Sequence, residues 1–215
     1  MTDRLIEGFH SFRAKEYDDE AASMPALVRD GQKPEYFIIS CIDSRANPGV
    51  IFQPPPGTFF AHKAMGAIVR PYEQGTALAA ALQFALIHMK VQNIIILGHT
   101  ECGAIKALAD NIQDEEIASF VQVAQKGMQA ARDKVDTQNE TALLRQAEKE
   151  IVLQSTENLK TYPSVASALN DGALTLKSWV FEMGHGNLLE YDEAKKDFVT
   201  LTNFKASGDT TAACC

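Results

Sequence analysis

The chain has 215 residues, of which 46% are apolar and 22% charged, a balance typical of a folded globular protein rather than a disordered or fibrous one. Its formal net charge of −8 lacks the basic excess of nucleic-acid-binding proteins and disfavours an anionic membrane surface as a partner. The best candidate for a membrane span, residues 74–89, is shorter than the roughly 20 apolar residues that a span needs. We therefore expect neither a nucleic-acid nor a membrane partner.

Cysteine usage indicates a reducing compartment. The chain has four cysteines, which are too few for the dense disulfide framework of a secreted scaffold. The first residues also lack the apolar core of a signal peptide, and we predict a cytoplasmic protein. Cys41 and Cys102 lie inside the chain, where such cysteines are packed, bound to metal or catalytic. No role is assigned to Cys214 and Cys215.

Short apolar segments alternate with helical ones in chain order. Residues 2–30 are predicted to be helical, with an apolar stripe that must pack against the chain's own core or against a partner subunit. The stripe consists of Leu5, Phe9 and Phe12. Three short strands follow, with a buried alanine-rich helix before the third. The strands cover residues 36–40, 58–62 and 93–97, and the helix covers residues 76–90.

The second half of the chain is predicted to be mostly helical before it ends in a hairpin. A helix begins near Gly103, residues 110–150 have an acidic helical pattern, and a further helix stops before Pro163. Residues 174–191 are predicted to form two strands joined by a Gly-His-Gly-Asn turn.

This alternation predicts an α/β fold with a mainly parallel sheet flanked by helices. We expect about four parallel strands plus an antiparallel edge strand, and an N-terminal helical arm over residues 1–30. A single core can grow to about 250 residues, so residues 1–205 are predicted to form one domain. Residues 206–215 are small and polar and are predicted to be a flexible tail.

Two cysteines and a histidine lie where such a fold places its sites. Cys41 directly follows the first predicted strand, and His99 and Cys102 follow the third. The carboxyl ends of parallel strands meet at one edge of the sheet, so these side chains can converge. Thiolate and imidazole are ligands that zinc prefers, and three of them leave a fourth position open for catalysis. The other interpretation is a buried cysteine pair beside a satisfied histidine.

A charged pair follows Cys41. Asp43 and Arg45 are two residues apart, so their side chains can point the same way and pair. Beside a metal ion, Asp43 can either become a fourth ligand or be held back by Arg45 as a hydrogen-bond acceptor. An ordinary surface salt bridge, which contributes little, is the alternative.

The two segments together resemble the signature of the β-class carbonic anhydrases. The family's patterns are Cys-x-Asp-x-Arg and His-x-x-Cys-Gly, and this chain has CIDSR from Cys41 and HTECG from His99. The resemblance covers residues 25–195 and includes the segments FQPPPGTFF, EKEIV, NLKTYPSV and LTLKSWVFE.

The resemblance implies a zinc enzyme that reversibly hydrates CO2 to bicarbonate and a proton. It implies one zinc ion per chain, with a ligand set of Cys41, His99 and Cys102. Asp43 and Arg45 would be the catalytic dyad that orients the attacking hydroxide. It also implies a homodimer, or a dimer-based assembly such as a homotetramer, in which the N-terminal helix packs on the partner subunit.

The same resemblance assigns a substrate pocket, in the form of the plant-like subgroup. Gln32 and Phe60 match two of its residues, Phe84 stands where the subgroup has tyrosine, and Gly103 follows the last ligand. Residues 63–67 depart from the family, which has Arg-Asn, then Ala or Gly, then a second Asn.

A second subgroup has an inhibitory bicarbonate site made of Trp, Arg and Tyr. Ile38, Lys63 and Phe181 stand at those positions, so we expect that this site is absent.

Three other functions compete with CO2 hydration. Relatives of this family hydrolyse carbonyl sulfide or carbon disulfide, which are linear uncharged molecules that the same centre could attack. A non-catalytic zinc-binding or thiol-sensing domain is another interpretation, but it needs neither Asp43 nor Arg45. A dithiol redox protein would require Cys41 and Cys102 to form a disulfide.

Overall fold

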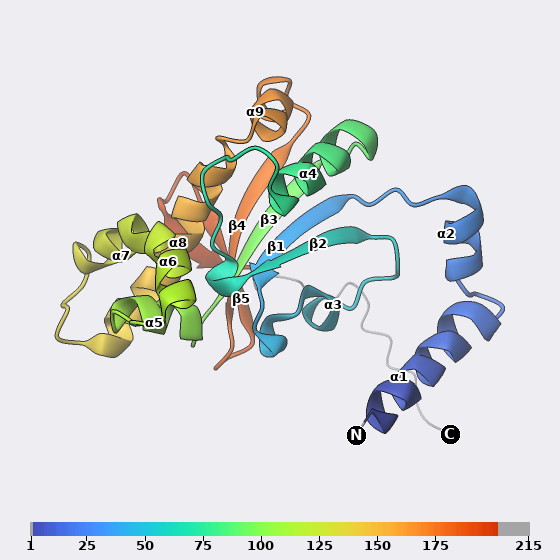
Figure 1. Ribbon diagram of the computed structural model, residues 1–215, viewed down its shortest axis with the longest axis horizontal. Coiled ribbons are helices and arrows are strands. Elements are labelled where there is room, and N and C mark those ends of the chain that lie inside the picture. Colours follow the sequence, from blue (N-terminus) through green and yellow to red (C-terminus); the bar gives the residue numbers. More distant parts are fainter. Residues whose placement is uncertain (1, 202–215) are drawn as a thin grey trace, which may run out of the picture.

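A six-stranded sheet lies at the centre of the computed structural model, which describes residues 2–201 (Figure 1). The strand order is β2-β1-β3-β4-β5-β6. The first four strands in this order are parallel, and β5 and β6 are antiparallel. The strands are β1 Tyr36–Cys41, β2 Phe59–Ala64, β3 Asn93–His99, β4 Thr175–Glu182, β5 Asn187–Asp192 and β6 Asp197–Thr200.

The predicted fold class is confirmed, with one more antiparallel strand than expected. The predicted hairpin is β4 and β5, and its turn lies between Glu182 and Asn187. The additional strand is β6, which has four residues and is therefore too short to show a clear alternation of apolar and polar residues. The segment 206–215, predicted to be flexible, lies outside the described residues.

Nine α-helices occur within residues 2–201. They are α1 Asp3–Arg13, α2 Met24–Asp30, α3 Pro48–Ile51, α4 Ala77–Gln83, α5 Gly103–Ala109, α6 Glu115–Val121, α7 Gln125–Arg132, α8 Glu140–Leu159 and α9 Pro163–Asn170. None of these helices combines the length and the apolar run that crossing a bilayer requires.

The N-terminal arm is two helices instead of one. A π-helical turn, Ala14–Asp18, extends α1, and the chain then leaves helical geometry at Asp19, which is extended. The Asp19 carboxylate accepts a hydrogen bond from the backbone N–H of Ala21 at 2.8 Å. Aspartate commonly ends a helix in this way, because its side chain offers the backbone a competing partner.

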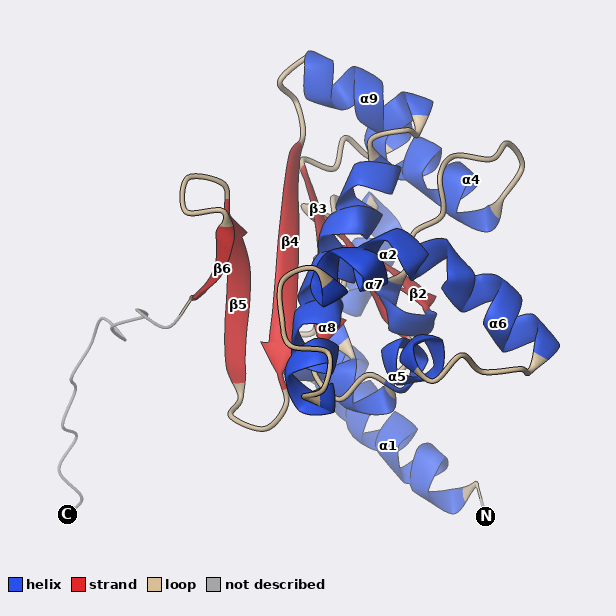
Figure 2. Ribbon diagram, turned by 90° about the vertical axis from the view of Figure 1, so that its left-hand side faces the viewer, coloured by secondary structure: helices blue, strands red, loops and turns tan. Residues whose placement is uncertain are grey.

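The main core lies between the sheet and the helices α4, α8 and α9. Figure 2 shows most of the helices gathered to one side of β4, β5 and β6. Side chains that point to this side include Phe37, Ile39, Ile94 and Ile96, all almost completely buried. On the other side of the sheet, Ile38, Ile95 and Leu97 form a smaller cluster with aromatic side chains from β2, β4 and the end of α3.

The arm stands away from this core. Figure 1 shows α1 and α2 beyond the β2 edge of the sheet, and α1 buries none of its residues. The predicted apolar stripe is therefore open, with Leu5 77%, Phe9 56% and Phe12 41% exposed. Of the two destinations expected for this stripe, the chain's own core is excluded.

The carboxyl-terminal end of β3, at Gly98, lies unusually close to α8. A Cβ atom placed on Gly98 would collide with Val152 of α8 and would also approach the backbone oxygens of Trp179 and Glu148. Only glycine fits at this point, and its absent side chain lets β3 deliver His99 directly beside the long helix. Close approach of two backbones is a common reason for glycine within a strand.

We expect Gly98→Ala to lower the free energy of unfolding by about 1–3 kcal/mol, the usual cost of overpacking a core. Urea denaturation followed by circular dichroism measures this change. Gly184→Ala is the matched control, since a Cβ there meets no atom within 4 Å. Equal stability of the two variants would contradict the proposed contact with α8.

Candidate metal centre

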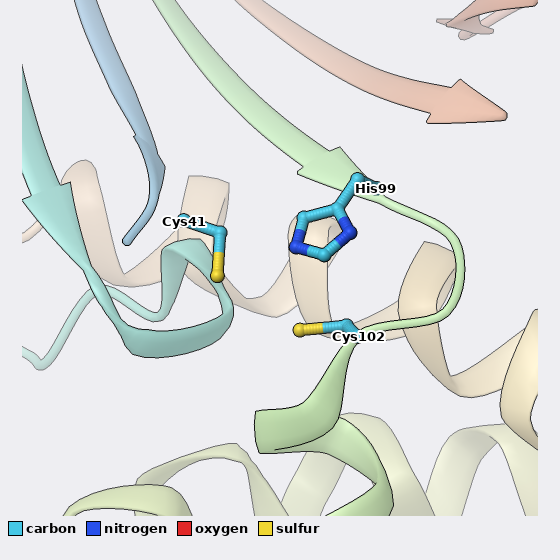
Figure 3. A group of neighbouring side chains, drawn as sticks. All are labelled: Cys41, His99 and Cys102. Atoms are coloured by element: carbon cyan, nitrogen blue, oxygen red, sulfur yellow. The ribbon is translucent and has the colours of Figure 1, made fainter. Parts of the chain in front are cut away.

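Three potential metal ligands meet at the carboxyl edge of the sheet. Cys41 is the last residue of β1 and His99 is the last residue of β3, which pairs with β1 in parallel. Cys102 follows after a short turn and is the residue that precedes α5. Figure 3 shows the three side chains directed towards a common point. Their ligand atoms lie within 4.8 Å of one another, and all three residues are buried.

The imidazole of His99 is held in the tautomer that a metal requires. Its Nδ1 lies 2.8 Å from the carbonyl oxygen of Thr100, which can only accept a hydrogen bond, so Nδ1 carries the proton. The Nε2 atom is then a lone-pair donor. It is buried and has no hydrogen-bond partner. A buried polar atom without a partner is costly, and a metal ion is the natural acceptor of this lone pair.

The thiol of Cys41 is placed to be a thiolate. Its Sγ accepts hydrogen bonds from the backbone N–H of Asp43 at 3.4 Å and of Gly66 at 3.2 Å. Hydrogen bonding from the Cys102 side chain is the largest cause that lowers the pKa of Cys41. The same contact raises the pKa of Cys102, because the neighbouring pair shares one proton. A metal ion would replace that proton and bind both sulfurs as thiolates.

Two residues of the segment 63–67, which departs from the family pattern, contact Cys41. Besides the Gly66 N–H, the Lys63 ammonium donates to the carbonyl oxygen of Cys41 at 2.9 Å. Gly66 has a φ of +62°, a conformation that favours glycine. The altered segment therefore holds Cys41 through one side-chain and one backbone hydrogen bond.

Asp43 is held by Arg45 and is not a member of the ligand cluster. Arg45 donates from Nε and Nη2 to the two carboxylate oxygens at 3.1 and 2.8 Å, and its backbone N–H donates to one of them at 2.9 Å. Hydrogen bonding from Arg45 is the main reason that the pKa of Asp43 lies far below its usual value. In this arrangement Asp43 is a fixed carboxylate outside the cluster of Cys41, His99 and Cys102, and these three side chains would leave a fourth position free on a metal with four ligands.

The turn that carries His99 and Cys102 is also bound to α8. The buried carboxylate of Glu148 accepts a hydrogen bond from the backbone N–H of Cys102 at 3.1 Å. Arg145 forms an ion pair with Glu148 at 2.6 Å and a second one with Glu101, within the turn. Burial raises the pKa of Glu148, and the Arg145 guanidinium opposes this effect.

Sequence reasoning assigned no role to Glu148 or Arg145, although a signal was present. Leu144, Ala147, Ile151 and Ser155 have helical spacing around Glu148, which places this acid on the side of α8 that faces the core. Acidic residues are rarely buried unless they have a partner, so an acid on that side indicates a specific contact.

The predicted pocket residues do not surround the ligands within one chain. Gly103 is adjacent to Cys102. Phe60, however, lies four residues before Ala64, which is the residue of β2 that pairs with Cys41. At about 3.3 Å per residue, this separation is about 13 Å along the strand. Phe84 packs on Phe60, with ring centroids 6.0 Å apart. Gln32 is exposed in the segment before β1.

The donor set fits a borderline-soft divalent metal such as zinc. Two sulfurs and one imidazole nitrogen are typical zinc ligands, and three protein ligands are the pattern of catalytic rather than structural sites. Both cysteines are free, as metal binding requires. A metal explains the unpartnered Nε2 of His99 beside the two sulfurs better than a redox dithiol does, because a redox pair has no need of that imidazole.

Comparison with known proteins gives one consistent family. A family model described as carbonic anhydrase matches residues 36–188. A carbonic anhydrase from Synechocystis sp. is 33% identical over 91% of this chain and 73% of its own length. One from Pseudomonas aeruginosa is 30% identical over 92% and 90%. The solved structure of the β-carbonic anhydrase CcaA is 30% identical, covers 93% of this chain and 91% of its own, and superposes with a TM-score of 0.84.

Removing a residue that only hydrogen-bonds to a metal ligand weakens metal binding by roughly 10–100-fold. We expect His99→Ala to weaken the binding of divalent metals by more than this, because it removes a proposed ligand itself. The dissociation constant is measured by competition with a chromophoric chelator, and the metal content by mass spectrometry after dialysis. His62→Ala is the control, because His62 is a half-buried histidine on β2 outside the cluster. Full metal content in His99→Ala would refute the assigned ligand set.

Proposed function

The chain belongs to the carbonic anhydrase family, and from this premise we propose that its Cys41, His99 and Cys102 side chains hold one zinc ion that serves the reversible hydration of CO2 to bicarbonate. One observation carries the proposal: a buried imidazole Nε2 without a partner faces two cysteine sulfurs within 4.8 Å. The neighbouring carboxylate is held away by an arginine. No observation favours carbonyl sulfide or carbon disulfide over CO2.

Bound zinc supplies Lewis-acid activation of water, a chemistry for which carbonic anhydrase is itself the standard example. The chain's own residues provide the setting. The N–H at Nδ1 of His99 donates a hydrogen bond to the Thr100 carbonyl oxygen, which keeps the ring in one orientation. The backbone N–H groups of Asp43 and Gly66 donate hydrogen bonds to the Cys41 sulfur and stabilise its negative charge.

Asp43 is proposed to orient the attacking oxygen. Its pKa is lowered by Arg45, so the group is an ionised acceptor at neutral pH and cannot donate a proton there. Such a carboxylate would accept a hydrogen bond from the O–H of a hydroxide, whose proton stays on its oxygen, and would thereby direct an oxygen lone pair towards the carbon of CO2. Arg45 is the positioning residue that prevents Asp43 from moving onto the metal, because both carboxylate oxygens are engaged.

The active unit is proposed to be a homodimer, which can assemble further. The open stripe on α1 exposes three large apolar side chains, and such a stripe needs a surface to cover it. A hollow of about 220 Å³ on the less covered side of the sheet has the matching chemistry, with Ile38, Phe52 and Trp179 in its lining. These two surfaces support packing of the arm on a second copy of the chain.

A second chain also explains the predicted substrate pocket. Phe60 lies about 13 Å along β2 from the residue that pairs with Cys41, by the strand spacing given above. Phe84, in the helical segment after α4, packs on Phe60. If these residues and Gln32 line a CO2 pocket, a partner subunit supplies them. The free cysteines at the centre are consistent with a reducing compartment, and we propose a cytoplasmic location.

Stopped-flow CO2 hydration tests the activity. We expect rapid hydration by metal-loaded protein, its loss after chelation, and its return with zinc. Asp43→Ala is expected to lower kcat/KM by about 100-fold or more, the usual scale for a group that handles a proton in the transition state, while metal content is retained.

Asp192→Ala is the matched control for Asp43→Ala. Asp192 also accepts backbone N–H bonds, from Ala194 and Lys195, and pairs with the Lys195 cation, but it lies at the end of β5. We expect the hydration activity of the Asp192→Ala variant to match that of the unmodified protein. Absence of hydration from pH 6.5 to 9 by protein with one zinc per chain would reject the proposal.

The assembly is tested by light scattering after size exclusion. We expect a dimer or a multiple of it, and dissociation when Leu5 and Phe9 are both replaced by Asp, since burying the new charges is costly. Hydration activity is expected to fall with dissociation while metal remains bound. Ser11→Asp, on the polar side of α1, is the control. A fully active monomer at micromolar concentration would contradict this assembly.

A further inference from the structure

The geometry around α8 points to a positioning residue for the metal centre outside the ligand set and the Asp43–Arg45 pair. We propose that Glu148, fixed by Arg145, sets the position of the Cys102 ligand by holding its backbone N–H. The inference rests on the proposed metal site and deepens it. It assigns this carboxylate a role in metal affinity and ligand geometry rather than in general stability of the fold.

Glu148 is a buried carboxylate, which is stable only with specific partners. Its side chain is 2% exposed, in the apolar interior between α8 and the sheet. A carboxylate in such a place is tolerated only when its charge and lone pairs are matched by donors. Nη1 of Arg145 donates to both carboxylate oxygens at 2.7 and 2.6 Å, and the backbone N–H of Cys102 donates to one of them at 3.1 Å.

The backbone donor belongs to Cys102, the residue proposed to supply a metal-binding sulfur. The backbone N–H of Cys102 is one bond from the Cα that carries the ligand side chain, so its hydrogen bond limits where Sγ can lie. Partners of this kind orient the ligands and tune metal affinity in many metalloproteins. Gly98 adds to this control, because its close contact with α8 brings the turn within reach of Glu148.

The rest of the turn is held by the same arginine and by Arg45. Glu101 has a φ of +58°, in the left-handed region that a non-glycine residue adopts only when its surroundings impose it. Arg145 pairs with the Glu101 carboxylate, and Arg45 donates to the Glu101 carbonyl oxygen at 3.3 Å. The turn between His99 and Cys102 is therefore fastened to α8 on one side and to the Asp43–Arg45 pair on the other.

Glu150 provides a matched control on the same helix. It is also a buried acid, 8% exposed, and it is paired with Lys134 at 2.7 Å and with Gln146 at 2.7 Å. Its hydrogen bonds connect α8 to the end of α7 and to the preceding turn of α8, not to the segment 99–102. Replacing Glu150 therefore removes a buried ion pair of the same helix without altering the support of Cys102.

The experiment compares the full-length chain with Glu148→Ala, Glu148→Gln and Glu150→Ala. Each protein is loaded with Co²⁺, and the affinity is measured by competition with a chelator. The thiolate-to-cobalt charge-transfer and d–d absorption bands report ligand geometry independently of activity. Thermal unfolding of the metal-free proteins separates effects on the fold.

We expect Glu148→Ala to bind Co²⁺ about 10–100-fold more weakly, with shifted absorption bands. Glu148→Gln keeps an oxygen that accepts the Cys102 N–H and should recover most of the affinity. Glu150→Ala should lower the unfolding temperature and leave both affinity and spectrum unchanged. A role confined to fold stability would instead move the unfolding temperature alone in all three variants.

Unchanged affinity and spectrum in folded Glu148→Ala would overturn this inference and leave the proposed function intact. Failure of the unmodified chain to bind Co²⁺ or Zn²⁺ would overturn both. If Glu148→Ala does not fold, Arg145→Met replaces it, because this change releases the Glu148 carboxylate while keeping a long apolar side chain. Weakened Co²⁺ binding by Arg145→Met would then support the proposal, and unmodified binding would refute it.

Discussion

The parallel pairing of β1 with β3 is the constraint on which the site depends. Ser40 lies opposite Leu97, so the two strands leave the sheet at one edge and carry Cys41 and His99 to the same place. Local structure cannot bring these two residues together, because β2 and α4 lie between them in the chain. The site is therefore a consequence of strand register. Its other residues, Asp43 and Cys102, follow shortly after the ends of β1 and β3.

Charge pairing explains how so many acidic groups gather at one point. Three acidic residues lie around Cys41 and Cys102: Asp43 donates its backbone N–H to the Cys41 sulfur, Glu101 precedes Cys102 in the chain, and Glu148 accepts the Cys102 N–H. Each carboxylate is paired with an arginine: Asp43 with Arg45, and the other two with Arg145. The arginines compensate the local negative charge and keep the carboxylate oxygens engaged elsewhere. A metal ion would therefore meet three protein ligands and an open position rather than a closed shell.

Three features of the single chain support the proposed assembly of two copies. Its first helix exposes an apolar stripe to solvent, a hollow lined by Ile38, Phe52 and Trp179 is open on one side of the sheet, and Phe60 lies about 13 Å along β2 from the residue that pairs with Cys41. The homodimer that we propose accounts for all three features, because a second copy would cover the exposed surfaces and bring Phe60 to the site. The departure of residues 63–67 from the family pattern is compatible with an intact centre, because Lys63 and Gly66 contact Cys41 directly.

The sequence by itself determined the apolar strands, the alternation that gives an α/β fold, and the short motifs with the ligands and the Asp43–Arg45 pair. These depend on local periodicity and on residues close together in the chain. Tertiary structure decided what no local pattern encodes: the break of the arm at Asp19, the strand β6, the tautomer of His99, and the contact of Glu148 with Cys102. Glu148 lies 46 residues from Cys102, and only the packing of α8 against β3 at Gly98 joins them. Such contacts follow from how whole elements pack, and this packing is a property of the entire fold rather than of any segment.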